Sequence, residues 1–592
     1  MKRALIAAAS GLVLADAAIV TLALPPLLLE LDTTVEGVAA VIAVYTAVLA
    51  LALPLSAALH GRWTGPAGAL LFAAASVGCA SASSLELLLV MRALQALGGA
   101  ALLAAAFDAL DGGGAGRRVW IGAAVAGTAA GPALGGLLTE LFDWRAIFIA
   151  QAPVALAAAP ALLSAHAVTV RDHLALPRRD VLAAVALALL SGALTAVVFL
   201  LVLLLISGWS VEPIAAALAV SVLPVAAVAG SLIRGPAATR AVAGCVLVAG
   251  GIACLALLPE ASALWTIVPQ ILAGVGMGMA FPAIAGELLP ERTRGEASAL
   301  LSLRHAGITL ALVALAPIVA AELDEQVDLA RERGTAVVLD SALPPTDKIA
   351  MAPRLFAEIE TEDPRDALAQ AVRRERRRVG RGDSDLLSRL EQLEGQLGAD
   401  TGGLLGELEE LEDQYGGGLL DELNERLGGA TSPEELRGEL DELADELDDI
   451  VLAAVDAAFS PAFAITGGMA LLAAIVLLPG RRRLRAGAIG LAVALAVAVP
   501  ALYAVARTEL EQEPVEIADP CEDRERDSVG GVEGAAEEVA LDALDRAACE
   551  FGSSREELVL ALFDDESRRA YEREHGVDPR SLEELLRGIV GL

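Results

Sequence analysis

Two charged side chains lie near the middle of long apolar stretches of this sequence. Asp16 lies within the apolar run 4–29, and Arg92 lies within the run 87–107. A charge at the centre of a bilayer costs at least roughly 2.5–3.5 kcal/mol on insertion scales, so we expect both side chains to face a bundle interior or an aqueous cavity. Desolvation favours the protonated form of a carboxyl group, so Asp16 could exchange protons or bind a cation, with Arg92 as its partner. A structural polar network between the two helices would use the same residues, and both interpretations remain open.

Other polar residues inside apolar runs are candidates for lining a cavity. Gln95, Gln151 and Gln270 could each present an amide to a polar solute. Arg304 lies about two turns into its apolar run, where the simpler interpretation is a cytoplasmic anchor for the helix and the other is a place in the cavity.

The residue types exclude several kinds of chemistry. Lys2 and Lys348 are the only lysines, so the sequence has no P-loop and ATP is not the expected energy source. The five cysteines form no C-x-x-C pair, which excludes a zinc ribbon and a dithiol redox motif. The acidic run 441–449 lacks the glycine turn of a calcium loop. No nucleophile–base pair is visible, so we expect neither an enzyme, nor a cofactor, nor a metal site.

Charge and hydrophobicity are separated along the chain. The chain has 592 residues and a formal net charge of -34, yet 56% of its residues are hydrophobic. Residues 321–450 hold 35 Asp and Glu against 14 Lys and Arg, and residues 508–592 hold 25 against 9. The rest is nearly neutral, which indicates a membrane body with two acidic soluble segments. Their acidity argues against a nucleic-acid partner, which needs a basic face.

The apolar runs are long enough to span a lipid bilayer as helices, which need about 20 residues. Thirteen such runs are present: 4–29, 37–59, 63–85, 87–107, 119–139, 146–165, 181–211, 213–233, 241–259, 261–286, 297–321, 457–480 and 486–506. Sixteen Lys and Arg residues lie in one alternate set of short connections, whereas the other set holds only Arg145. The positive-inside rule therefore predicts a cytoplasmic N-terminus, and parity places both acidic segments and the C-terminus outside.

These observations predict an all-α, polytopic membrane protein with two six-helix halves, a thirteenth helix and two extracytoplasmic helical segments. The predicted parts are the N-terminal half 1–165, the cytoplasmic connection 166–180, helices 7–11 at 181–320, the acidic insert 321–450, helix 12 at 451–480, the arginine cluster 481–485, helix 13 at 486–507 and the acidic C-terminal domain 508–592.

Several motifs stand in the order found in one transporter family. The segment GTAAGPALGG, with Gly127, Gly131, Pro132, Gly135 and Gly136, resembles the G-x-x-x-G-P-x-x-G-G signature of antiporters, in which small residues let helix backbones approach closely. The other matching segments are LADAAIVTLALPPLLLELDTT around Asp16, RALQALGGAA around Arg92, DWRAIFIAQAP, GVGMGMAFP and GEASALLSLRHAG. Together they resemble the drug:proton antiporters of the major facilitator superfamily over roughly 1–320 and 457–480. The resemblance implies that Asp16 and Arg92 take part in proton coupling.

The sequence departs from this family in two places. The family motif GxLADRxGRR between helices 2 and 3 is reduced to ALHGRWTG, which keeps Arg62 and Gly65 but lacks the aspartate of the usual cytoplasmic charge lock. The matching signatures also belong to a fourteen-helix branch, whereas this chain has no extra pair of helices between its halves.

The acidic segments show helical patterns. Leu390, Leu397, Leu404 and Leu411 are seven residues apart, but glycines interrupt the pattern, which favours a self-packed helical domain over a long dimerising coil. The C-terminal segment has helical runs near 532–550, 554–574 and 581–592, and Ser554 with Glu557 forms a capping box. Cys521 and Cys549 are the only cysteines outside the apolar runs, and the predicted topology places both in an oxidising compartment, so we expect them to form a disulfide.

The resemblance implies a proton-coupled secondary transporter in the cell membrane that exports amphipathic or drug-like small molecules. Its partners would be the lipid bilayer, protons and a small-molecule substrate, with a possible protein partner for the outer segments. The alternative is a membrane sensor or scaffold built on a transporter body, which the missing aspartate and the large outer segments would favour.

Overall fold

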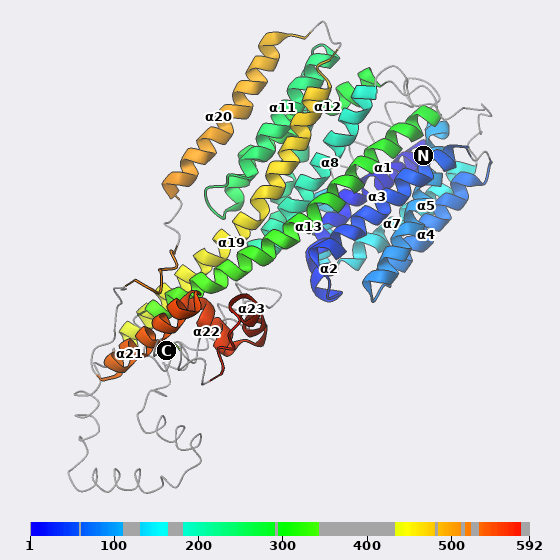
Figure 1. Cartoon of the computed structure of the whole chain (residues 1–592). Helices are drawn as coiled ribbons and strands as arrows, with labels where there is room; N and C mark the ends of the chain where they lie inside the picture. The colour runs from blue at the N-terminus through cyan, green and yellow to red at the C-terminus, as the bar shows by residue number, and fades with distance from the viewer. Residues whose placement is uncertain are drawn as a thin grey trace. The chain divides into compact units, whose positions relative to one another are not determined.

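The computed structural model describes residues 2–58, 61–110, 131–163, 181–289, 294–341, 348, 433–479, 484–510, 515–522 and 532–581 (Figure 1). Helices are the only regular elements within these ranges, which confirms the predicted all-α class. The chain divides into two compact units. Unit 1 comprises 1–325 and 455–512, and unit 2 comprises 326–454 and 513–592.

The first half of unit 1 consists of apolar helices. Its helices are α1 (Lys2–Val20), the 3₁₀ turn η1 (Thr21–Ala23), α2 (Leu24–Glu30), α3 (Val35–Ala58), α4 (Thr64–Ala80), α5 (Leu85–Leu110) and α7 (Arg145–Leu163), with a further helical stretch over 131–141. The change from α1 to α2 coincides with Pro25 at the start of α2, because proline cannot donate the hydrogen bond that would continue the helix.

The second half of unit 1 contains helices of more varied length, interrupted by π and 3₁₀ turns, and parts of α13 and α19 belong to unit 2. Its elements are α8 (Val181–Leu203), η2 (Leu204–Gly208), α9 (Pro213–Val220), α10 (Val222–Ser231), α11 (Ala237–Leu255), η3 (Ala263–Thr266), α12 (Ile267–Phe281), η4 (Pro282–Leu288), α13 (Arg294–Asp340), α19 (Pro433–Val476) and α20 (Ala486–Leu510). Eleven helices among the described residues are long and apolar enough to cross a membrane, and Thr64–Ala80 is a shorter apolar helix. The expected span 119–139 lies partly outside the described residues.

Two helices run through the sequence boundaries that we expected at the insert. The helix α13 does not end near residue 320 but continues to Asp340, and α19 begins at Pro433, well before the apolar run at 457. The stretch 322–340 after the apolar part of α13 has no proline, and most of its residues are compatible with a helix, so the sequence contains no signal that ends the helix at a membrane surface.

Unit 2 has its own apolar cores. The ends of α13 and α19 bury Val337 and Val338 with Leu443 and Leu447. The helices α21 (Val532–Phe551), α22 (Arg555–Phe563) and α23 (Asp565–His575) form a second core with the members Ala547, Ala548, Leu558, Ala561 and Tyr571.

The helical run expected over 554–574 is two helices rather than one. Its interruption is at Asp564, whose carboxylate accepts a hydrogen bond from the Ser567 N–H at 2.5 Å and so begins a new helix. At the start of α22 the Glu557 N–H donates to Ser554 Oγ at 3.0 Å, which is one half of the expected capping box. The leucine pattern at 390–411 and the run 581–592 lie outside the described residues, apart from Ser581.

Candidate functional site

Asp16 and Arg92 meet in the interior of the first half. The Asp16 carboxylate on α1 lies 2.6 Å from the Arg92 guanidinium on α5, between Oδ2 and Nη2, and both side chains have 0% exposure. Both charges therefore lie in a bundle interior, one of the two environments expected from the sequence, and protein atoms enclose them fully. Ionised groups in such a place must be paired, since removal of one partner leaves an uncompensated buried charge.

Two of the three predicted glutamines extend this pair into a network. The Gln151 amide on α7 donates to Asp16 Oδ1 at 2.8 Å, and the Gln95 amide donates to Gln151 Oε1 at 2.8 Å. Arg92 Nη1 in turn donates to Gln95 Oε1 at 2.6 Å. Gln95 also donates to the Ser76 hydroxyl on α4 at 2.9 Å. The hydrogen bonds and the Asp16–Arg92 ion pair thus form one network shared by the four helices α1, α4, α5 and α7.

Aromatic side chains complete the surroundings of Arg92. Its guanidinium carbon lies 4.2 Å from the centre of the Tyr45 ring on α3 and 5.6 Å from the Phe148 ring on α7. The Tyr45 hydroxyl donates to the Val13 carbonyl at 3.0 Å, which orients the ring. Sequence reasoning missed both rings, and the only available signal was the scarcity of aromatic residues in the chain, which makes each one inside an apolar run noteworthy.

Arg92 also has partners other than Asp16. Arg92 Nε also donates to the Val41 carbonyl at 3.2 Å, so the guanidinium keeps two hydrogen bonds and two aromatic contacts without the carboxylate. Arg92 therefore has protein partners besides Asp16, and its ion pair with Asp16 links α5 to α1.

The glycines of the antiporter-like motif lie against α1, next to Asp16. A Cβ atom at Gly131 would lie 2.9 Å from Ala18 Cβ, and one at Gly135 would lie 2.3 Å from the Ile19 carbonyl oxygen. At Gly136 it would lie 2.3 Å from Ala217 Cβ on α9, in the second half. The absence of side chains at these positions therefore allows close backbone approach, as the motif predicts. Gly127 lies outside the described residues, and Pro132 lies in the same helical stretch.

The remaining predicted residues do not join this network. Gln270 on α12 donates to the Thr266 hydroxyl at 3.0 Å in the second half. Arg304 on α13 has a buried Nε with no hydrogen-bond partner in the described part of the chain. Its neighbour His305 is buried, with Nδ1 2.7 Å from the Leu301 carbonyl oxygen.

Direct polar contacts join the two halves between α3 and α13. The hydroxyls of Thr46 and Thr309 lie 2.9 Å apart, and the Ser302 hydroxyl donates to the Ala50 carbonyl at 2.5 Å. Neither contact was expected from the sequence, because threonine and serine are common in apolar helices. Arg62 of the reduced family motif stacks on Trp63, with its guanidinium carbon 5.3 Å from the ring centre, and forms no ion pair with a carboxylate among the described residues.

Arg145, the one basic residue in the acidic set of connections, is neutralised locally. Its guanidinium lies 2.6 Å from Glu30 and 3.2 Å from Asp143 and stacks 4.3 Å from the Trp144 ring centre. The Trp144 indole also donates to Glu30 at 2.5 Å. The ion pair of Arg145 with Glu30 therefore links α7 to α2.

The thirteenth helix, α20, packs on α11 (Figure 1). A Cβ at Gly250 would lie 2.5 Å from Ala496 Cα, and the Tyr503 hydroxyl donates to the Trp265 carbonyl at 2.7 Å. An apolar groove of about 540 Å³ lies between α11, α19 and α20, and all its lining side chains are apolar. The groove contains none of the residues predicted for the site.

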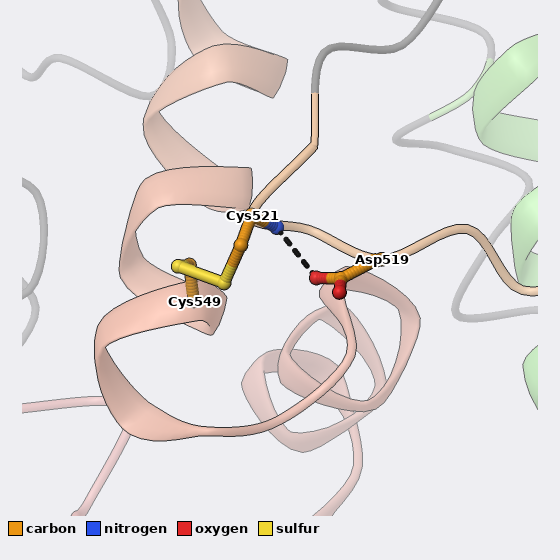
Figure 2. The surroundings of a disulfide bond; sticks show 3 residues. All are labelled: Asp519, Cys521 and Cys549. Atoms are coloured by element: carbon orange, nitrogen blue, oxygen red, sulfur yellow. Dashed lines mark hydrogen bonds between the residues drawn. A yellow bond between two sulfur atoms is a disulfide. The ribbon is translucent and has the colours of Figure 1, made fainter.

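Cys521 and Cys549 are joined by a disulfide in unit 2 (Figure 2). The Cys521 N–H also donates to the Asp519 carboxylate at 2.8 Å, which fixes the chain before the bridge. Cys79, Cys245 and Cys254 are free and buried.

Comparisons with known proteins agree with this architecture. The family model described as Major Facilitator Superfamily matches residues 6–312. Two versions of "Multidrug resistance protein Stp" from Mycobacterium tuberculosis, strains CDC 1551 and ATCC 25618, are 35% and 34% identical over 164 residues. This match covers 25% of the chain and only 30% of each relative's length.

Solved transporter structures are also similar at low identity. A bacterial homolog of the human lysosomal transporter Spinster, inward-facing and occupied, is 12% identical with a TM-score of 0.49, covering 81% of this chain and 98% of that one. The nucleoside transporter NupG is 12% identical with a TM-score of 0.42, covering 54% of this chain and 91% of that one. Since the family model spans more than half of the sequence, the chain belongs to the Major Facilitator Superfamily, among multi-pass membrane transporters and not among enzymes.

Proposed function

We propose that this protein is a proton-coupled secondary transporter that exports amphipathic or drug-like small molecules from the cell. The observation that carries the proposal is the sealed Asp16–Arg92 ion pair with Gln151, which binds the carboxylate from its other side. A titratable carboxylate at this depth is costly and marks a proton or ion pathway by default. The multidrug resistance relatives support the substrate class.

The coupling would operate through the close contact of α1 with its neighbours. Protonation of Asp16 would weaken the link between α1 and α5, while Gly131 and Gly135 leave α1 without intervening side chains on the motif helix. We infer that α1 then changes its position relative to the motif helix. Alternating access would follow if the contacts of the two halves, such as Gly136 with Ala217, open and close with it.

The proposed orientation places the N-terminus in the cytoplasm and the C-terminus outside the cell membrane. The sixteen basic residues on one side support it. Arg145 is the one basic residue in the opposite set of connections, and its ion pairs with Glu30 and Asp143 offset its charge.

Proton flux in proteoliposomes tests the function. Purified protein would be reconstituted with a trapped pH-sensitive dye and offered a panel of cationic and neutral amphipathic compounds under an imposed pH gradient. We expect substrate-dependent proton movement in the wild type and its loss in Asp16→Asn. The matched control is Glu86→Gln, which removes an exposed carboxylate from α5 and should leave the flux unchanged. Equal flux in Asp16→Asn and wild type would refute coupling through Asp16, and export without any proton movement would refute proton coupling itself.

A further inference from the structure

Unit 2 brings three metal-binding side chains together at the contact of α22 and α23. Glu557, Glu574 and His575 each offer a ligand atom, and these atoms all lie within 4.8 Å of one another. His575 Nε2 and Glu557 Oε1 are 2.9 Å apart. We propose that Glu557, Glu574 and His575 bind a divalent transition-metal ion, with zinc as the best match. The sequence had predicted no metal site, because Glu557 is distant along the chain from the adjacent pair Glu574 and His575 and the three form no known motif.

The local fold orients the histidine for this role. His575 is the last residue of α23, and Gly576 ends the helix in the left-handed conformation with a φ of 71°. The ring of the buried Tyr571 lies 4.5 Å from the His575 ring, and the Tyr571 hydroxyl lies 2.7 Å from the Ser553 hydroxyl. The imidazole is therefore held in place before any ion binds, which lowers the cost of binding.

The ligand set fits zinc better than calcium or magnesium. Zinc accepts imidazole nitrogen and carboxylate oxygen at about 2.0–2.2 Å in tetrahedral geometry, which places ligand atoms about 3.4 Å apart. The three ligand atoms here lie within 4.8 Å of one another, and Glu574, whose side chain is exposed, would move closer to the other two on binding. Calcium and magnesium prefer all-oxygen sets, and calcium needs six to eight ligands.

The charge around the three side chains also favours a cation. Glu332 on α13, in the same unit, has its pKa raised to about 7 by burial and by the charges of Glu557 and several other carboxylates. Two arginines of these helices are already paired with other carboxylates: Arg555 with Asp340 and Glu556, and Arg568 with Glu572 and Asp578. A divalent ion would offset this excess of negative charge.

Binding must displace the hydrogen-bonding proton between His575 and Glu557. In the metal-free form one proton lies between Nε2 and Oε1, whichever atom carries it. Zinc would take both atoms as ligands, and that proton would leave to solvent.

The test uses the full-length protein in detergent, stripped with a chelator, with zinc chloride as the probe. We expect calorimetry and elemental analysis to show one bound zinc per chain. Affinity should fall at least about tenfold in His575→Gln and Glu557→Gln. The control, Glu566→Gln, removes an exposed carboxylate from α23 outside the cluster and should bind zinc like the wild type.

Three outcomes would overturn the proposal: no zinc binding to the stripped wild type, unchanged affinity in His575→Gln, or equal affinity for magnesium. If His575→Gln does not fold, as judged by circular dichroism, Glu574→Gln provides the same comparison. The Glu574 side chain is exposed, so its replacement should leave the fold intact. Unchanged zinc affinity in Glu574→Gln would then count against the site. None of these results depends on transport activity.

Discussion

Replacing either member of the Asp16–Arg92 pair should destabilise the protein, but only one of the two penalties should depend on pH. Asp16→Asn leaves a buried guanidinium without its counter-ion, and arginine stays charged at every pH at which a protein survives. Arg92→Gln leaves a buried carboxylate, which can become neutral by taking up a proton. The two variants therefore test whether the pair is ionised and whether Asp16 can accept a proton.

The structure sets the expected magnitudes. Removal of one partner from a buried ion pair costs about 3–5 kcal/mol, and both side chains are fully buried here. In Arg92→Gln the unpaired carboxylate can be neutralised by a proton, so the penalty should be smaller at pH 5.5 than at pH 7.5. The folded variant binds the extra proton, so its stability rises as the pH falls. The Asp16→Asn penalty should stay constant over this range.

The double variant Asp16→Asn/Arg92→Gln completes the cycle. It leaves no buried charge at this site, and the amides of Gln95 and Gln151 can still hydrogen-bond the new side chains. We expect its loss of stability to be smaller than the sum of the single losses by at least about 2 kcal/mol, because the singles each leave an uncompensated charge.

The assay is equilibrium unfolding of detergent-solubilised protein at pH 7.5 and 5.5, followed by tryptophan fluorescence. Glu86→Gln, on the same helix as Arg92 but exposed, controls for the general effect of losing a charge. Additive single losses, or a pH-independent penalty in Arg92→Gln, would refute the view of an ionised pair with a titratable Asp16.

Three further outcomes follow from other contacts. Gly135→Ala should lower the free energy of unfolding by about 1–3 kcal/mol and impair transport, because the new Cβ would lie 2.3 Å from the Ile19 carbonyl oxygen. The control Gly490→Ala on α20, with no atom within 4 Å of the new Cβ, should leave the stability unchanged or raise it slightly in the same assay. Cys521→Ser should lower the free energy of unfolding of unit 2 by about 2–5 kcal/mol, and reductant should do the same to the wild type but not to the variant; equal reductant sensitivity would contradict a structural bridge. The pKa of Glu332 is raised to about 7, so its contribution to stability is present below about pH 4.5 and is lost as the pH rises through 7. Glu332→Gln, measured with chelator present, should therefore be more stable than wild type at pH 8 by about 1 kcal/mol, a figure reduced for solvent screening. No gain in stability at pH 8 would contradict the buried, carboxylate-rich surroundings of Glu332.

The sequence predicted the inward-facing charges for a physical reason that requires no coordinates. Hydrocarbon cannot solvate Asp16 or Arg92, so each had to face protein or water. Which of these it would be, and whether the two would meet, depended on the rotation and packing of α1 and α5. The same holds for Gln95 and Gln151, which joined the pair, and for Gln270, which did not. Chemically these three residues are equivalent in the sequence.

The sequence located the apolar parts of the helices but not where the helices end. The apolar runs located the spanning helices, but α13 extends to Asp340 because hydropathy changes at a membrane surface while helix propensity does not. The break at Asp564 was missed because a capping residue inside a polar helical pattern looks like any other surface acid.

By itself the sequence determined the class of the protein: apolar runs of spanning length, basic residues on alternate sides and an ordered set of antiporter-like motifs leave few architectures other than a multi-pass transporter body with acidic segments. These are properties of single segments, which solvent and chain length decide. The tertiary structure alone decided which distant side chains meet, as Asp16 does with Arg92 and Glu557 with His575. Such contacts depend on how helices far apart in the chain pack against one another, and the pattern within any one helix does not contain that information.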